Sequence, residues 1–324
     1  MDLGMLIRLL VAVSFIFTSG LAAAEAWPAR PVRVIVAFAP GSTPDVVARI
    51  VSERLSLRIG KPVIVDNKPG AAGNIGTDAV AKAAPDGYTL GVTISGPLAA
   101  NTVLFKKLPY NPYTDITPIS IAATQPSVLV VPQQSGITDV PALLARLREN
   151  PGKFNYASMG TGSISHLAMA ALAARSGTEI VHVPYPGSGQ AVTSMLAGDT
   201  QMAVLPAASV MPHVRAGKLK ALAVATAKRS TVLPELPTLA ESGLHDIQGD
   251  AWMGFIAPAG TPVAIMARLQ KDIAQIVNSD DVRKKLQTMV MEPVGGTAAE
   301  FRATLEADLA RWRPVIQKNH LVLD

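Results

Sequence analysis

A recurring order of short β-branched segment, Gly/Pro/Ser-rich loop and helical segment is the feature that most limits what this chain can fold into. It first occurs where the apolar residues 32–38 precede the loop 39–44 and a helical pattern over 45–59. It recurs through residues 62–93 and again between 128 and 225. Because strands that alternate with helices are typical of α/β folds, this order predicts α/β sheets whose strands are mostly parallel.

The predicted strands are too many for one small sheet, so we expect two α/β lobes. The strands are expected at 32–38, 62–65, 88–93, 128–131, 154–158, 180–183, 202–205 and 219–225. The C-terminal part is expected to be helical over 262–277, 281–289 and 297–318. Thr297 and Glu300 have the spacing of a capping box at the start of the last helix.

The N-terminus has the pattern of a secretory signal peptide. Arg8 precedes the apolar residues 9–17, and small residues then lead to Ala24-Glu25-Ala26, an A-x-A cleavage site before Trp27. The apolar stretch is shorter than the roughly 20 residues of a membrane-spanning helix. Since the chain contains no Cys, it has neither a lipid attachment site nor disulfides. We therefore expect residues 1–26 to be removed and the mature protein to be soluble in the periplasm.

Composition argues against several functions. The formal net charge is +5, but the charges are scattered and aromatic residues make up only 5% of the chain, which does not favour nucleic-acid binding. The five histidines lack metal-ligand spacing, and no nucleophile elbow, P-loop or H-E-x-x-H motif occurs. We expect no metal, no cofactor and no enzymatic activity. One alternative stays open, a periplasmic hydrolase that uses Ser163 or Ser165 with His166.

Three loops that follow predicted strands are rich in hydrogen-bond donors. They are the loop 40–45, the Gly/Ser loop 159–166 and the loop 183–189. Ligands of open α/β sheets bind beyond the carboxyl ends of strands, and the N-terminus of a helix attracts anions. The Gly/Ser loop is similar to a dinucleotide motif, but Ser165 occupies the third glycine position and no acidic residue closes the next strand. The loops therefore predict a site for a small anion.

Several segments resemble the receptors of tripartite tricarboxylate transporters, the Bug-type periplasmic solute-binding proteins. These segments are Trp-Pro-Ala-Arg-Pro at 27–31, Phe-Ala-Pro-Gly at 38–41, Asp-Asn-Lys-Pro-Gly-Ala-Ala-Gly-Asn-Ile-Gly at 66–76, Pro-Asp-Gly-Tyr-Thr-Leu at 85–90, Asn-Pro-Gly-Lys-Phe-Asn-Tyr at 150–156, Ala-Gly-Lys at 216–218 and Ala-Pro-Ala-Gly-Thr-Pro at 257–262. Their order and spacing run through the whole mature chain.

This resemblance implies a type II periplasmic-binding-protein fold, in which two α/β lobes are joined by crossing strands and hold the ligand in the cleft between them. Lobe 1 would comprise residues 27–126 and 248–324, and lobe 2 residues 127–247. The protein would be a monomer that captures a small carboxylate and delivers it to membrane transporter subunits. A sensor receptor that signals to a membrane kinase is the alternative with the same fold.

In this family two loops grip one carboxylate, largely through backbone N–H groups, and they correspond here to 40–45 and 160–166. Asp45 is expected either to bind the ligand or to cap its helix, and His166 to pack behind the Gly/Ser loop. The residues expected to bind ligand are Phe38, Pro40, Gly41, Ser42, Thr43, Asp45, Ser95, Gly160, Thr161, Gly162, Ser163, Ser165, His166, Tyr185, Gly187 and Leu205.

The identity of the ligand depends on positions where the chain departs from the usual family pattern. Ser42 replaces a glycine, Pro44 removes a backbone donor, and Pro186 stands where Lys is common. The lack of Lys and Arg in the three loops argues against a tricarboxylate. Leu205 and Pro206 predict an apolar wall at the far end of the site.

Overall fold

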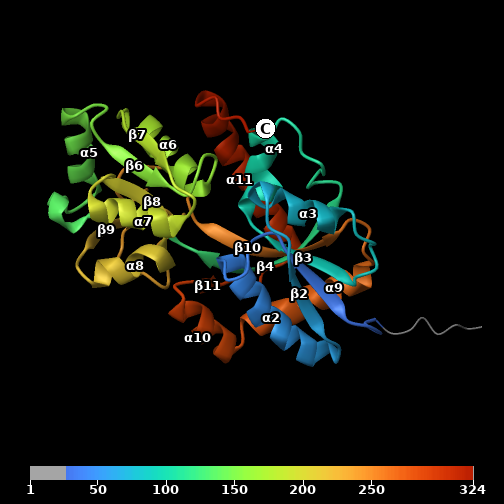
Figure 1. Cartoon of the computed structure of the whole chain (residues 1–324). Helices are drawn as coiled ribbons and strands as arrows, with labels where there is room; N and C mark the ends of the chain where they lie inside the picture. The colour runs from blue at the N-terminus through green and yellow to red at the C-terminus, as the bar shows by residue number, and fades with distance from the viewer. Residues whose placement is uncertain (1–26, 324) are drawn as a thin grey trace, which may run out of the picture.

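Two separate β-sheets form the framework of the protein, as a computed structural model that describes residues 27–323 shows (Figure 1). The six-stranded sheet has the order β11-β4-β10-β3-β1-β2, and the five-stranded sheet has the order β7-β6-β8-β5-β9. We call the parts built around them the first and the second lobe. The predicted two-lobed α/β fold is therefore confirmed. The predicted signal peptide lies outside the described residues.

The first lobe combines the N-terminal third of the chain with its C-terminal end. Its strands are β1 (Val32–Val36), β2 (Val63–Asn67), β3 (Thr89–Thr93), β4 (Ile116–Gln125), β10 (Ala251–Pro258) and β11 (Glu292–Pro293). Its helices are α2 (Thr43–Ile59), η1 (Ala71–Gly73), α3 (Asn74–Ala81), η2 (Gly96–Ala100), α4 (Asn101–Leu104), α9 (Val263–Val277), α10 (Asp280–Thr288) and α11 (Ala298–Lys318).

The second lobe is one continuous stretch of chain. Its strands are β5 (Ser127–Pro132), β6 (Asn155–Ser158), β7 (Val181–Pro184), β8 (Met202–Pro206) and β9 (Leu219–Val224). Its helices are η3 (Gln133–Ser135), α5 (Val140–Glu149), α6 (Ile164–Ser176), α7 (Ser188–Ala197) and α8 (Ala207–Arg215). The strands predicted in this region were correct to within a residue or two.

The prediction of mostly parallel strands was wrong, because both sheets are mixed. β1 pairs in parallel with β2 and β3, and β6 with β7 and β8. Strands near the lobe junction pair in the antiparallel direction. β10 is antiparallel to β3 and β4, and β5 is antiparallel to β8 and β9. The cause is topological, since a chain that leaves one sheet and later returns must insert crossing strands of opposite direction.

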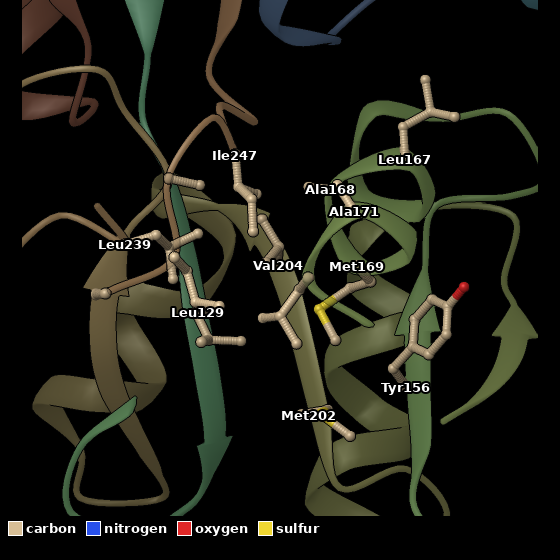
Figure 2. Close-up of a cluster of buried hydrophobic side chains, with 14 of the residues drawn as sticks. Leu129, Tyr156, Leu167, Ala168, Met169, Ala171, Met202, Val204, Leu239 and Ile247 are labelled. Carbon is tan, nitrogen blue, oxygen red and sulfur yellow. The ribbon is translucent and has the colours of Figure 1, made fainter. Parts of the chain in front are cut away.

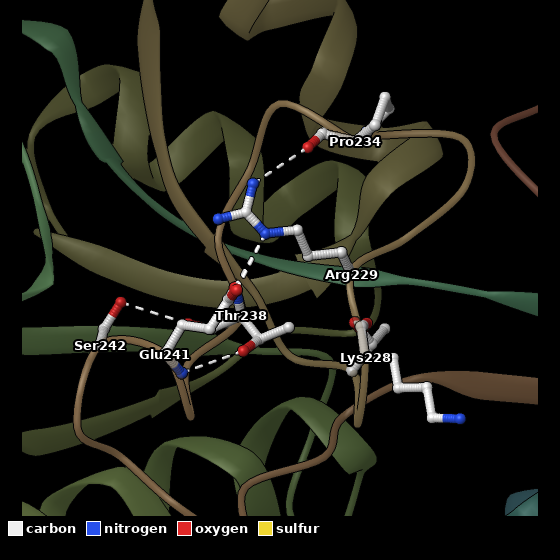
Figure 3. A network of polar contacts seen from close by, with 7 residues as sticks. Lys228, Arg229, Pro234, Thr238, Glu241 and Ser242 are labelled. Carbon is white, nitrogen blue, oxygen red and sulfur yellow. Dashed lines mark hydrogen bonds and ion pairs between the residues drawn. The ribbon is translucent and has the colours of Figure 1, made fainter.

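The chain crosses between the lobes twice. Only Pro126 separates β4 from β5, so the first crossing is nearly continuous strand. The return runs from β9 to β10 through residues 225–250, a long connection that polar contacts hold in place (Figure 3). In it the Arg229 Nε donates to the carboxylate of Glu241 at 3.0 Å, and Glu241 also accepts from the backbone N–H of Thr238 at 2.8 Å. This second crossing is thus an ordered segment.

The second lobe buries its own core, and α11 of the first lobe contributes to it. Figure 2 shows part of this cluster, with Met169 of α6 beside Val204 of β8. Trp312 and Ile316, near the end of α11, are buried in the same cluster. Figure 1 shows α11 between the lobes, beside α4. The last helix therefore connects the two lobes by apolar packing.

The start of α11 bears out the sequence prediction. Thr297 accepts from the backbone N–H of Glu300, and the Glu300 carboxylate accepts from the backbone N–H of Thr297 at 2.7 Å. This reciprocal pair is the predicted capping box. Among the described residues, no helix combines the length and the apolar character that crossing a membrane requires.

Gly254 in β10 lies against α11, and this contact gives a test of the packing. An ideal Cβ on Gly254 would lie 2.2 Å from Cζ of Phe301. We expect Gly254→Ala to lower the free energy of unfolding by about 1–3 kcal/mol, because overpacking forces Phe301 or the strand to shift. Urea unfolding measures this change. Gly189→Ala in α7 is the control, since no atom lies within 4 Å of its Cβ position. Equal losses in both variants would contradict the packing.

Candidate functional site

A cavity of about 260 Å³ lies where the two lobes meet, and it receives residues from both. The first lobe supplies Phe38 after β1, Ser95 after β3 and Asn101 of α4. The second lobe supplies the Gly/Ser loop between β6 and α6, the returning crossing supplies Asp250, and β10 supplies Ala251. Five of the predicted ligand-binding residues line this cavity: Phe38, Ser95, Thr161, Gly162 and Ser163.

Hydrogen bonds inside the Gly/Ser loop determine which of its donors remain for a ligand. The N–H of Met159 donates to Ser165 Oγ at 2.8 Å, that of Gly160 to Ser158 Oγ at 3.1 Å, and that of Gly162 to His166 Nδ1 at 3.0 Å. The loop is sharply bent, with φ of 108° at Gly160 and 77° at Gly162, values that favour glycine. These N–H groups, which include those of the predicted residues Gly160 and Gly162, therefore already have partners within the protein.

The remaining donors of this loop face the cavity or begin the helix. Thr161 has no hydrogen bond to another described residue through either its N–H or its hydroxyl. Ile164 and Ser165 are the first residues of α6, where backbone N–H groups have no partner within the helix. Ser163 is the N-cap of α6, and its hydroxyl accepts from the N–H of His166. Thr161 and Ile164, which both line the cavity, are thus available to an anion.

His166 supports this loop from behind, as the sequence predicted. Its ring stacks on that of His182 with centroids 3.9 Å apart, and the ring of Tyr156 lies near both, 5.0 Å from His182 and 6.3 Å from His166. Burial, together with the nearby His182, lowers the pKa of His166 to about 4, and burial also lowers the pKa of His182. His166 is therefore neutral at pH 7, which leaves Nδ1 free to accept from Gly162.

The arrangement does not suit a serine hydrolase. Ser163 Oγ donates to the carbonyl of Gly160 at 2.6 Å and lies 3.0 Å from Ser165 Oγ, and neither hydroxyl is bonded to a histidine ring. Within residues 27–323, the pair in which a serine hydroxyl does meet a histidine is Ser158 with His182 at 2.6 Å. Ser158 is fully buried, so no substrate can reach it.

Asp45 holds the first loop, and it does not occupy the N-cap position that was one of the two expectations for it. Ser42 occupies the N-cap position of α2, without a side-chain capping bond, and Asp45 lies three residues inside. The Asp45 carboxylate accepts from the N–H of Gly41 at 2.9 Å, from Arg49 Nε at 3.0 Å and from Asn67 Nδ2 at 2.8 Å. Burial alone would raise its pKa, but these hydrogen bonds outweigh burial and lower the pKa.

Other predicted residues lie away from the cavity. Gly41 and Thr43 line a second groove of about 250 Å³, between the start of α2, α8 and residues 288–291. Tyr185 lies behind the Gly/Ser loop, where its N–H donates to the carbonyl of Ser158 at 3.0 Å. Gly187 is the N-cap of α7. Leu205 is fully buried in the core of the second lobe, so its side chain has no open face.

Two polar residues of the cavity were missed from the sequence, Asn101 and Asp250. Asn101 stands in an alanine-rich segment that gave no motif. Asp250 lies just after residue 248, where the chain was expected to re-enter lobe 1, and a lone acid there could have been noticed. Among the described residues there is no cluster of three or more potential metal ligands.

Comparison with known proteins identifies the family. The model of the tripartite tricarboxylate transporter receptor family matches residues 47–321. This chain belongs to that family. The receptor is 36% identical to the protein BugT of Bordetella pertussis over 96% of this chain and 97% of BugT. It is 38% identical to a protein encoded in the tcbD–tcbE intergenic region of a Pseudomonas species, over 97% of this chain and 94% of that protein.

Solved structures agree with this assignment. An R. palustris protein in complex with adipate superimposes with a TM-score of 0.79 and 34% identity, covering 90% of the receptor and 97% of that chain. The protein MatC from Rhodopseudomonas palustris, with bound malate, gives a TM-score of 0.75 and 31% identity, over 90% and 100% of the two chains. The receptor therefore has the fold of periplasmic solute-binding proteins, as predicted.

The neutral state of His166 predicts how the stability of the receptor depends on pH. Below pH 6.5 the unfolded chain binds a proton at this residue and the folded chain does not, so stability falls as the pH drops toward about 4. We expect this to contribute on the order of 3 kcal/mol. His166→Asn, whose Oδ1 can accept from Gly162, should lose this part of the pH dependence in urea unfolding measured between pH 7.5 and 4.

His166→Leu serves as the comparison, because it removes the acceptor as well as the titrating group. It should be less stable than His166→Asn at pH 7.5, since the N–H of Gly162 loses its partner. Parallel pH curves for the original receptor and His166→Asn would show that His166 does not titrate in this way.

Proposed function

We propose that the receptor binds the carboxylate of a small organic acid in the cavity between its lobes and delivers it to the membrane subunits of a tripartite transporter. The observation that carries this proposal is the pair of unpaired donors, Thr161 and Ile164, at a cavity that both lobes line. The adipate and malate bound by the two similar structures are acids of the same class.

The chemistry of the cavity suits one carboxylate. Backbone N–H groups at the start of α6 lie at the positive end of its helix dipole, which favours an anion. Hydrogen bonds from such donors to an ionised carboxylate are charge-assisted and strong. Among the described residues that line the cavity, none is Lys or Arg. The site would therefore bind a carboxylate without burying a fixed cation beside it, which fits one carboxylate better than three.

The mechanism we propose is closure of the lobes around the ligand. A ligand shifts an open–closed equilibrium only by binding the closed form more tightly, so it must contact both lobes. Phe38 and Ser95 stand on one side of the cavity and Thr161 on the other. In this proposal the rigid units are residues 27–126 with 248–324, and residues 127–247. The closed form is what the transporter would recognise.

The receptor would act as a monomer in the periplasm after removal of residues 1–26. The family assignment supports a transporter as the partner. No described feature favours a hydrolase or a sensor receptor for a membrane kinase.

The proposal predicts binding of acids but not of their amides. The receptor, comprising residues 27–324, is unfolded, dialysed and refolded to remove carried-over ligand, and its melting temperature is measured with a library of small carboxylates and their matched carboxamides. At least one acid should raise the melting temperature, since a ligand that binds only the folded state stabilises it. No shift with any acid, or equal shifts with acid and amide, would contradict carboxylate binding.

Thr161→Val tests the loop directly, because it removes the free hydroxyl at the cavity. We expect affinity for the bound acid to fall roughly tenfold to a hundredfold, the range for loss of a hydrogen bond to a charged group. Thr193→Val on the exposed face of α7 is the control and should leave affinity unchanged, since its hydroxyl only donates to the carbonyl of Gly189. Isothermal titration calorimetry measures both. Unchanged affinity in Thr161→Val would exclude this contact.

A further inference from the structure

The cavity between the lobes contains unpaired hydrogen-bond acceptors as well as donors. Thr161 and Ile164 offer donors on the side of the second lobe. Asp250 and Asn101 line the same cavity and offer acceptors from the returning crossing and from α4. A simple carboxylate would use the donors and leave the acceptors without partners.

Asp250 is a carboxylic acid at this cavity without a partner. Its side chain makes no hydrogen bond or ion pair with another described residue. The residue is partly exposed, lines the cavity, and has a hydrogen bond from its own backbone N–H. Arg311, whose charge acts on Asp250, is already hydrogen-bonded to Asp308 at 2.8 Å and also to Gln248. The charge of Asp250 is thus left for something else to balance.

The surroundings of Asp250 carry an excess of negative charge. Burial, together with the charges of Asp308 and Glu292, raises the pKa of Asp250 to about 6, although its own backbone N–H and the charge of Arg311 act to lower it. Two carboxyl groups, those of Asp308 and Glu292, therefore act on Asp250 against the single guanidinium of Arg311. A second ligand carboxylate beside Asp250 would add to the repulsion, whereas a cation would relieve it.

Asn101 independently supplies a second acceptor, and its orientation is fixed by its neighbours. The Asn74 Oδ1 accepts from Asn101 Nδ2 at 2.6 Å and lies 3.0 Å from the Tyr110 hydroxyl, which also donates to the carbonyl of Pro97 at 2.8 Å. The same Nδ2 also donates to the carbonyl of Ala72 at 3.4 Å. Asn101 is only 3% exposed, and its Oδ1 has no donor among the described residues. A buried acceptor of this kind calls for a donor from a ligand.

We propose that the receptor selects carboxylates that also carry an ammonium group, with Asp250 as the counter-ion of the ammonium and Asn101 as a second acceptor for it. This inference rests on the proposed function, because the donors of the Gly/Ser loop would hold the carboxylate of the same ligand. The ligand class is then a small zwitterionic amino acid. In this proposal Asp250 determines the specificity for the ammonium group. Thr161 and Ile164 bind the carboxylate, which every small organic acid has.

The test uses matched triads of an amino acid, the corresponding hydroxy acid and the unsubstituted acid. Suitable triads are alanine, lactate and propionate; aspartate, malate and succinate; and glutamate, 2-hydroxyglutarate and glutarate. Calorimetry at pH 7.5 should show, in at least one triad, that the amino acid binds at least tenfold more tightly than both other members. Tightest binding by the hydroxy acid or the unsubstituted acid in every triad would overturn the proposal.

Asp250→Asn removes the charge while keeping the shape of the side chain. It should weaken binding of the preferred amino acid at least tenfold and change binding of the matching unsubstituted acid less than twofold. Asp246→Asn is the matched control, because Asp246 is an exposed acid that pairs with Arg175 at 3.2 Å outside this cavity. Thermal unfolding checks that both variants are folded, and Asp250→Ser replaces Asp250→Asn if the latter is not. Equal losses across a triad would overturn the assignment of Asp250.

The pH dependence of binding gives a further readout. An ammonium binds the ionised form of Asp250, so affinity for the amino acid should fall as the pH drops from 7.5 to 5, and Asp250→Asn should lack this fall. His166 titrates near pH 4, below this window. A pH-independent affinity in the original receptor would count against the proposal. Failure of the proposed function would look different, since then no acid in any triad would bind, or its carboxamide would bind as well.

Discussion

The carboxylate of Asp308 on α11 holds together the elements that meet at the cavity. It accepts from the Ser95 hydroxyl at 2.6 Å, from Trp252 Nε1 at 2.9 Å and from Arg311 at 2.8 Å, and it is only 7% exposed. These partners lie after β3, in β10 and in α11 itself. Because a buried charge is costly unless its hydrogen bonds are complete, the three elements are held in one arrangement. That arrangement places Ser95 and Asp250 at the same cavity.

The same helix connects this anchor to the second lobe. Beyond Asp308, α11 buries Trp312 and Ile316 in the core of the second lobe, against α6, which the Gly/Ser loop precedes. The chain then returns to the first lobe, where the N–H of Leu323 donates to the carbonyl of Leu104 at 2.7 Å. Lobe movement about the two crossings therefore has to change this packing, and binding energy from a ligand that contacts both lobes is what would offset the cost.

The sequence predicted local features well and long-range ones poorly. The α/β order, the capping box at Thr297 and the supporting role of His166 follow from neighbouring residues, and the structure confirms them. β10 was not predicted as a strand, because Gly254 and the terminal Pro258 are poor strand formers and its stability comes from pairing on both sides. The availability of donors was also misjudged, since only the fold shows that Gly41 and Gly162 donate internally. Asn101 and Asp250 reach the cavity through contacts between distant segments.

The most direct test of this account is a crystal structure of the receptor, residues 27–324, with the acid or amino acid that binds it most tightly in solution. The account predicts ligand density in the cavity between the lobes, with a carboxylate within hydrogen-bonding distance of Thr161 and Ile164 and contacts to Phe38 or Ser95 from the first lobe. Ligand density outside this cavity, for example in the groove between α6 and α11, or contacts with one lobe alone, would contradict it.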